Sequence, residues 1–252
     1  MKETRKQVLI ISFCVITVYI LSFICYLPIL LEQFGIIVSN VLLLLKYLFV
    51  CIPLIITVVF LICEHNFKSN FARMFSGKIT IKFILICAIF QIVGIIFTLC
   101  YSIIVKENIF LNTYSSIISV ITSCIYLFVT AFVEEIAWRG FLLERLPFKK
   151  KIFNIITVGV IWTIWHLPMW IIRNSLGVVQ ILHLVIWTFL ISIVLGTIYY
   201  QCKNIILIAI LHATFNICYL VPTQYNIIVL TILIVICILV KIIQHKKKQI
   251  SN

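Results

Sequence analysis

The chain has 252 residues, of which 64% are hydrophobic and only 11% are charged, and its mean hydropathy is +1.25. A soluble globular domain is typically about 45–50% apolar and about 25% charged, so this composition excludes one and predicts an integral membrane protein. The formal net charge of +13 predicts no nucleic-acid partner, because the lysines and arginines lie at the ends of hydrophobic segments, as the positive-inside rule describes.

Eight hydrophobic segments are candidates for crossing the bilayer core, which takes about 20 apolar residues as a helix. They cover approximately residues 8–31, 38–63, 79–105, 117–146, 152–172, 179–200, 205–221 and 227–243. The first segment lacks a small-residue cleavage pattern, so we expect a retained span rather than a signal peptide. With the N-terminus in the cytoplasm, most of the basic residues fall on the cytoplasmic side, which predicts that both termini are cytoplasmic.

Three polar clusters interrupt the later segments, and the first three segments contain nothing comparable. The clusters carry six polar side chains that are candidates for chemistry, namely Glu134, Glu135, Arg139, His166, His212 and Asn216. A helical rise of about 1.5 Å per residue places the glutamates and histidines roughly 14–22 Å from the cytoplasmic segment ends. Ionisable groups inside a span are costly and mark functional sites, so their common depth predicts a shared polar cavity.

These residue types fit a hydrolytic site. Two adjacent carboxylates in a low-dielectric pocket cannot both ionise cheaply, and either one could take a proton from water and return it to a leaving amine. Arg139 shares a helix face with Glu135 and would orient it. His212 and Asn216 would donate hydrogen bonds to an oxyanion, and His166 would position the water or share the proton transfer.

The same residues allow two other interpretations. Glu135, His166 and His212 make a plausible zinc ligand set, with a metal-bound water as nucleophile. Taken singly, each cluster also fits a structural role, as a buried ion pair or as hydrogen bonds between helices. The sequence therefore leaves open whether the site holds a divalent metal such as zinc or no cofactor.

The order of the motifs resembles a known family. Glu-Glu-x-x-x-Arg-Gly at residues 134–140, aromatic-x-x-x-His at 162–166 and His-x-x-x-Asn at 212–216 are similar to the motifs of the CPBP intramembrane proteases. This family is also called the Abi or CAAX-protease family and includes the type II CAAX prenyl endopeptidases. The resemblance covers approximately residues 117–220. One departure is Trp162, where the family usually has phenylalanine.

The resemblance implies roles for the matched residues. Glu134 or Glu135 would activate water, Arg139 would orient the two glutamates, and His166 would assist. His212 with Asn216 would form the oxyanion site. The family is often described as metalloproteases, although its prenyl-protease members are also interpreted as metal-free glutamate proteases. The implied organisation is three N-terminal membrane helices in residues 1–116, a catalytic core of four helices in 117–221, and a last helix with a basic tail in 222–252.

We therefore predict an all-α, polytopic bundle in the cell membrane that acts as an intramembrane endopeptidase. Its substrate would be a membrane-associated peptide or protein, processed in a bacteriocin-type pathway or in self-immunity, as the resemblance to small bacterial members implies. One alternative is a proton-coupled transporter or channel, because Glu, Arg and His also build proton relays. The inverted repeats that would favour a transporter are not visible. Another alternative is a non-catalytic immunity or scaffold protein with the same fold.

Overall fold

The structure, a computed structural model, describes residues 2–65, 67–79, 116–172 and 177–218, together with single residues between 81 and 103. All the regular elements in these ranges are helices, and strands are absent from them. The all-α fold class is therefore confirmed. Five segments are long and apolar enough to cross a membrane, namely Arg5–Gln33, Asn40–Cys63, Ile117–Leu143, Lys151–Ile172 and Val178–Cys202.

These five segments correspond to the first, second, fourth, fifth and sixth predicted spans. The seventh predicted span contains a shorter apolar helix, α10 (Ile205–Cys218). The predicted spans at 79–105 and 227–243 lie outside the continuously described residues. The total of eight spans and the three-part division of the chain therefore stay predictions, while the membrane character of the chain is shown.

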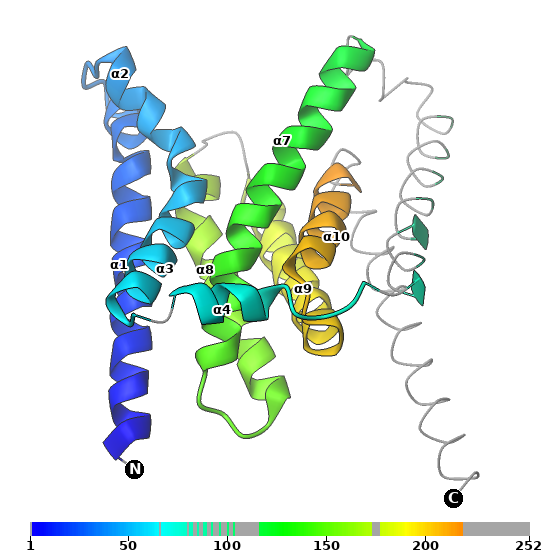
Figure 1. The fold of residues 1–252 in the computed structure, drawn as a ribbon. Helices are drawn as coiled ribbons and strands as arrows, with labels where there is room; N and C mark the ends of the chain where they lie inside the picture. The colour runs from blue at the N-terminus through cyan, green and yellow to red at the C-terminus, as the bar shows by residue number, and fades with distance from the viewer. Residues whose placement is uncertain are drawn as a thin grey trace, which may run out of the picture.

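The N-terminal half contains two longer helices, α1 (Lys2–Gln33) and α3 (Ile52–Cys63), that lie against each other and are joined by three short ones (Figure 1). Helix α1 ends in a Schellman motif, because Gly35 has φ of +77° and donates to the carbonyl of Glu32, while Ile36 donates to that of Leu31. The chain returns through the short helices α2 (Asn40–Leu43), η1 (Leu44–Tyr47) and η2 (Phe49–Cys51). It then enters α3, which has a proline in its first turn.

Helix α4 (Phe67–Met74) runs across the bundle, whereas α1 and α7 run along it (Figure 1). It is amphipathic: Lys68 and Arg73 are exposed, and Met74 is buried. Met74 packs on Gly140, where an added Cβ would lie 2.6 Å from the Met74 sulfur atom. The glycine that follows Arg139 therefore permits α4 to approach the polar segment of the chain closely.

The second half of the chain forms the helices that carry the polar clusters. Helix α7 (Ile117–Glu135) starts at a capping box between Ser116 and Ser119 and continues into η3 (Ile136–Leu143), which is a π-helix. Helices α8 (Lys151–Ile172) and α9 (Val178–Cys202) pack closely, because Gly159 and Gly196 leave room for side chains of the other helix. Helix α10 packs against α7 and α9.

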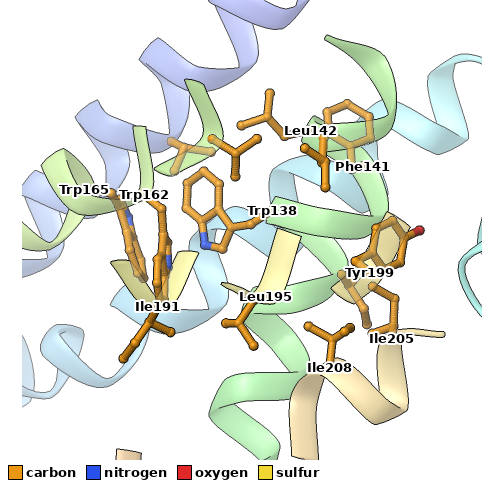
Figure 2. Close-up of a cluster of buried hydrophobic side chains, with 14 of the residues drawn as sticks. Trp138, Phe141, Leu142, Trp162, Trp165, Ile191, Leu195, Tyr199, Ile205 and Ile208 are labelled. Atoms are coloured by element: carbon orange, nitrogen blue, oxygen red, sulfur yellow. The ribbon is translucent and has the colours of Figure 1, made fainter. Parts of the chain in front are cut away.

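Figure 2 shows side chains from η3, α8, α9 and α10 meeting in one buried cluster. Its labelled members are Trp138, Phe141, Leu142, Trp162, Trp165, Ile191, Leu195, Tyr199, Ile205 and Ile208, all of them buried. Lipid chains are as apolar as these side chains, so close packing and polar contacts, rather than exclusion from water, hold helices together within a membrane. The cluster therefore fixes the rotation of each helix about its axis, which positions the polar residues.

Polar contacts hold one end of the bundle together. Gln7 in α1 donates to the carbonyl of Arg145 at 2.7 Å, and the Arg145 side chain forms an ion pair with Glu64 at 2.7 Å. Lys203, which follows α9, forms an ion pair with Glu144. The sequence assigns four segment ends to the cytoplasm: the start of α1 and the ends of α3, η3 and α9. These contacts show that the four ends lie on the same side of the bundle.

Candidate functional site

The site is built around a change in helix geometry. Glu134 and Glu135 are the last residues of α7, and Arg139 lies in the π-helix η3 that follows. A π-helix is closed by hydrogen bonds that span five residues instead of four; it is rare and occurs frequently at functional sites. The wider turn begins directly after the two carboxylates, within the first motif of the sequence.

Glu135 is the centre of a buried polar network. Its Oε1 atom accepts from Arg139 Nη1 at 2.7 Å and lies 2.8 Å from His212 Nδ1. Arg139 also donates through Nη2 to the hydroxyl of Ser192 in α9 at 2.9 Å. Glu135 and Arg139 have no exposed surface, and Ser192 and His212 are buried. The network thus joins α7, η3, α9 and α10, and it gives the Glu135 carboxylate a cationic partner.

Glu134 has a different environment from its neighbour. Its Oε2 atom accepts a hydrogen bond of 2.8 Å from the indole Nε1 of Trp162 in α8, a neutral donor. Glu134 retains 6% of its surface exposed, whereas Glu135 retains none. The ion pair with Arg139 is made by Glu135. The two adjacent carboxylates are therefore chemically distinct: one is bound to a cation, and the other is oriented by a neutral group.

His166 lies one turn after Trp162 on α8. Its Nδ1 atom is 2.9 Å from the carbonyl oxygen of Trp162. A carbonyl can only accept, so Nδ1 carries the hydrogen atom, and Nε2 of the neutral ring remains as an acceptor. The ring stacks on Trp170 and meets the edge of Trp165, with centroid distances of 5.3 and 4.7 Å. The aromatic contacts thus fix the ring that presents this acceptor.

Trp162 contacts the residues of all three motifs. The guanidinium carbon of Arg139 lies 4.6 Å from its ring centroid. The rings of His166 and His212 lie edge-on to the indole, with centroids at 5.0 and 5.1 Å. Together with the bond to Glu134, these contacts bring five of the six predicted site residues into one connected cluster.

Asn216 is the sixth predicted residue. It lies one turn after His212 on α10 and is half-buried. Within the described residues its side-chain amide has no hydrogen-bond partner, and such a group can donate to a ligand. Two atoms of the network, Glu135 Oε2 and Arg139 Nε, are likewise buried without a partner in the described part of the chain.

Sequence reasoning did not include two contacts of this site. Ser192 binds Arg139, yet a single serine in an apolar helix carries no signal that would distinguish it from other serines. Trp162 stands where the family usually has phenylalanine, and its indole donates a hydrogen bond to Glu134. The signal that could have revealed this donor was the tryptophan in place of phenylalanine in the second motif.

The residues that we considered as zinc ligands do not converge in a ligand geometry. Within the described ranges, no three side chains of His, Cys, Asp or Glu are grouped so that they could hold a metal ion. The Oε1 atom of Glu135 is bound to the guanidinium of Arg139, and a cation in that position repels a second cation. This arrangement does not fit a zinc site.

The fold and the site define a helical membrane protein with a buried cluster of carboxylates, arginine and histidines. Residues 115–218 match the family model described as "Type II CAAX prenyl endopeptidase Rce1-like". The chain is also 33% identical over 100 residues to "CAAX prenyl protease 2" of Methanococcus maripaludis. That alignment covers 36% of this chain and 36% of the relative, so the chain matches about a third of the relative's length. The resemblance is confirmed: the region that carries the three motifs matches the Rce1-like family model.

Proposed function

We propose that the protein is an intramembrane endopeptidase in which Glu134 activates a water molecule. The observation that carries this proposal is the division of roles between the adjacent carboxylates. Glu135 is bound to Arg139 and His212, whereas Glu134 has only a neutral donor and keeps part of its surface exposed. A general base needs a free lone pair and access to water, and the small exposed part of Glu134 supports this choice over the fully buried Glu135.

The reaction follows from the acceptors and donors of the cluster. A water molecule donates one hydrogen to Glu134 and the other to His166 Nε2, which leaves an oxygen lone pair for attack on the peptide carbonyl carbon. As the carbon–oxygen bond forms, Glu134 takes the proton. The carbonyl oxygen becomes an oxyanion, and the carbon–nitrogen bond breaks when Glu134 returns that proton to the leaving amine.

The oxyanion needs a hydrogen-bond donor. The Asn216 amide is such a donor in every protonation state. His212 uses Nδ1 for Glu135, so Nε2 of its neutral ring is an acceptor, and the ring donates to an oxyanion only when it carries both protons. We therefore assign the oxyanion contact first to Asn216. Glu135 and Arg139 hold His212 beside it.

The substrate class is part of the proposal. A site inside a helical membrane bundle receives peptides that lie in or on the bilayer, and the relative is named a CAAX prenyl protease. For this chain we propose a membrane-associated peptide or small protein without a prenyl group, such as a bacteriocin-type precursor. A precursor and an exporter encoded beside this chain would support that choice.

A cleavage assay tests the activity. The full chain, purified in lipid nanodiscs, is incubated with two probes: a farnesylated peptide that ends in a CAAX motif, and an unprenylated peptide with an apolar membrane-binding segment. Mass spectrometry of the products identifies the bond that breaks. We expect endoproteolysis of the unprenylated probe. Cleavage of the farnesylated probe alone would overturn the substrate class, and cleavage of neither probe would contradict the peptidase function.

Removal of metal ions gives a second expected result. Because the ligand geometry does not fit zinc, we expect the cleavage rate to stay within about twofold after dialysis against a strong chelator. The metal content of the dialysed protein is measured by mass spectrometry, so that the removal itself is verified. Loss of cleavage that zinc then restores would favour a metal-bound water and would displace Glu134 from its proposed role.

We also propose that the end held together by Gln7, Glu64, Arg145 and Lys203 faces the cytoplasm of a cell membrane. The basic residues near this end support the proposal through the positive-inside rule. A reporter that works only in the cytoplasm is fused before Met1 or after Asn252, and we expect both fusions to be active. Activity of an exported reporter at either position would contradict the proposed orientation.

A further inference from the structure

We propose that Trp162 is a positioning residue whose indole N–H fixes the Glu134 carboxylate for proton transfer. This inference rests on the proposed function of Glu134 as the base. It assigns to the tryptophan a task that an aromatic wall does not have, because phenylalanine in the same place provides the ring and lacks the donor.

The carboxylate of Glu134 is held in place by a residue of a neighbouring helix. A glutamate side chain has three rotatable bonds, and its position is defined only where something holds the carboxylate. Among the described residues, the Trp162 donor at 2.8 Å is the only hydrogen-bond partner of the Glu134 side chain. Trp162 is itself only 2% exposed and lies on α8, outside the helix that carries Glu134. The carboxylate is therefore oriented by an immobile group on a neighbouring helix.

The indole of Trp162 contacts Arg139 and Glu134 with different parts of its ring. Arg139 lies 4.6 Å from the centroid of the same indole, and its Nη1 and Nη2 atoms are bound to Glu135 and Ser192. The face of the indole thus receives the cation, while its N–H edge receives the other carboxylate. Glu134 thus accepts a hydrogen bond from the neutral indole of Trp162, while Glu135 forms the ion pair with Arg139. A base without a cationic partner keeps its lone pair for the proton of a water molecule.

The role of the Trp162 side chain can be tested without changing the role of its backbone. The bond to His166 uses the Trp162 carbonyl oxygen, so Trp162→Phe removes the N–H donor and keeps this carbonyl. A misplacement of about 1 Å in a catalytic group costs on the order of 100-fold in rate. We therefore expect kcat to fall about 10- to 100-fold in Trp162→Phe, with KM changed less than about threefold.

Trp165 offers a matched control on the same helix. It is also 2% exposed, and its indole donates a hydrogen bond of 2.8 Å to Ser22. Trp165 contacts the ring of His166, as Trp162 does, but its indole N–H does not donate to a carboxylate. Trp165→Phe removes the same atoms and keeps an aromatic ring beside His166, and we expect its loss of kcat to be several-fold smaller than that of Trp162→Phe. Equal losses of kcat in the two variants, or a wild-type kcat in Trp162→Phe, would overturn the proposal.

A stability measurement tests the contact without any substrate. The decrease in Tm caused by Trp162→Phe is measured in the wild-type background and in Glu134→Leu, which lacks an acceptor. We expect a smaller decrease in the Glu134→Leu background, because the hydrogen bond is already absent there. Additive decreases would refute the contact. If no probe is cleaved by the wild type, the proposed function fails, and this cycle still decides whether Trp162 holds Glu134.

Discussion

Glu134→Gln is expected to lower kcat for peptide cleavage by about 100- to 10,000-fold, the range that general acid–base catalysis contributes. Glutamine has nearly the shape of glutamate, and its carbonyl oxygen still accepts the hydrogen bond from Trp162. It cannot take a proton from water. The fold of this variant should therefore persist, and its Tm should lie within a few degrees of wild type, while KM changes little.

Glu135→Gln is the matched control, because it makes the same chemical change at the adjacent position. Glu135 binds the Arg139 guanidinium with no exposed surface on either residue. We expect this variant to lose stability first and activity as a consequence, with a clear decrease in Tm. Peptide cleavage at the wild-type rate by Glu134→Gln, measured as kcat in nanodiscs, would exclude Glu134 as the base.

Periodicity and depth predicted part of this site. The spacing of Glu135 and Arg139 places them on one helix face, and the structure gives an ion pair of 2.7 Å between them. The common depth of the polar clusters follows from their distance to the basic segment ends. The structure joins Glu134 and Glu135 in α7 to residues of α8 and α10. The spacing within the first motif and the depth of each cluster depend on residues near each other in the sequence.

Contacts between helices were not predictable in the same way. Which atom of His212 meets Glu135, and which residue of α9 meets Arg139, depends on how far each helix is rotated about its axis. That rotation is set by packing, such as the close approach at Gly159 and Gly196. The oxyanion contact of His212 stays a prediction, and the sequence did not indicate that its Nδ1 atom lies beside Glu135.

The π-helix was also beyond sequence reasoning. The residues 136–143 have the apolar composition of an ordinary membrane helix, and nothing in their order separates α7 from η3. Gly140 in the wider turn lies against Met74 of α4, and Arg139 of the same turn lies beside Glu135. A helix that changes its hydrogen-bond pattern does so because tertiary contacts compensate for the weaker local geometry.

The second large effect is expected from the buried ion pair of Glu135 and Arg139. Removing one member leaves the other charge buried without a partner, which typically costs about 3–5 kcal/mol of folding free energy. We therefore expect Glu135→Met and Arg139→Met each to be strongly destabilised in detergent. In the double variant neither charge remains, so its loss of stability should be far smaller than the sum of the two single losses.

The ion pair of Glu64 and Arg145 provides the comparison that gives this result its meaning. Its side chains are 33% and 14% exposed, so this partly buried pair is screened by solvent and lies nearer to exposed pairs, which contribute about 0–1 kcal/mol. Glu64→Gln should therefore change the free energy of unfolding by less than about 1 kcal/mol, measured by denaturant titration under the same conditions. Additive losses in the Glu135 and Arg139 variants would mean that these charges are stabilised by groups other than each other. In that case Glu135 would no longer be distinguished from Glu134 by its cationic partner, and the assignment of the base would have to be reconsidered.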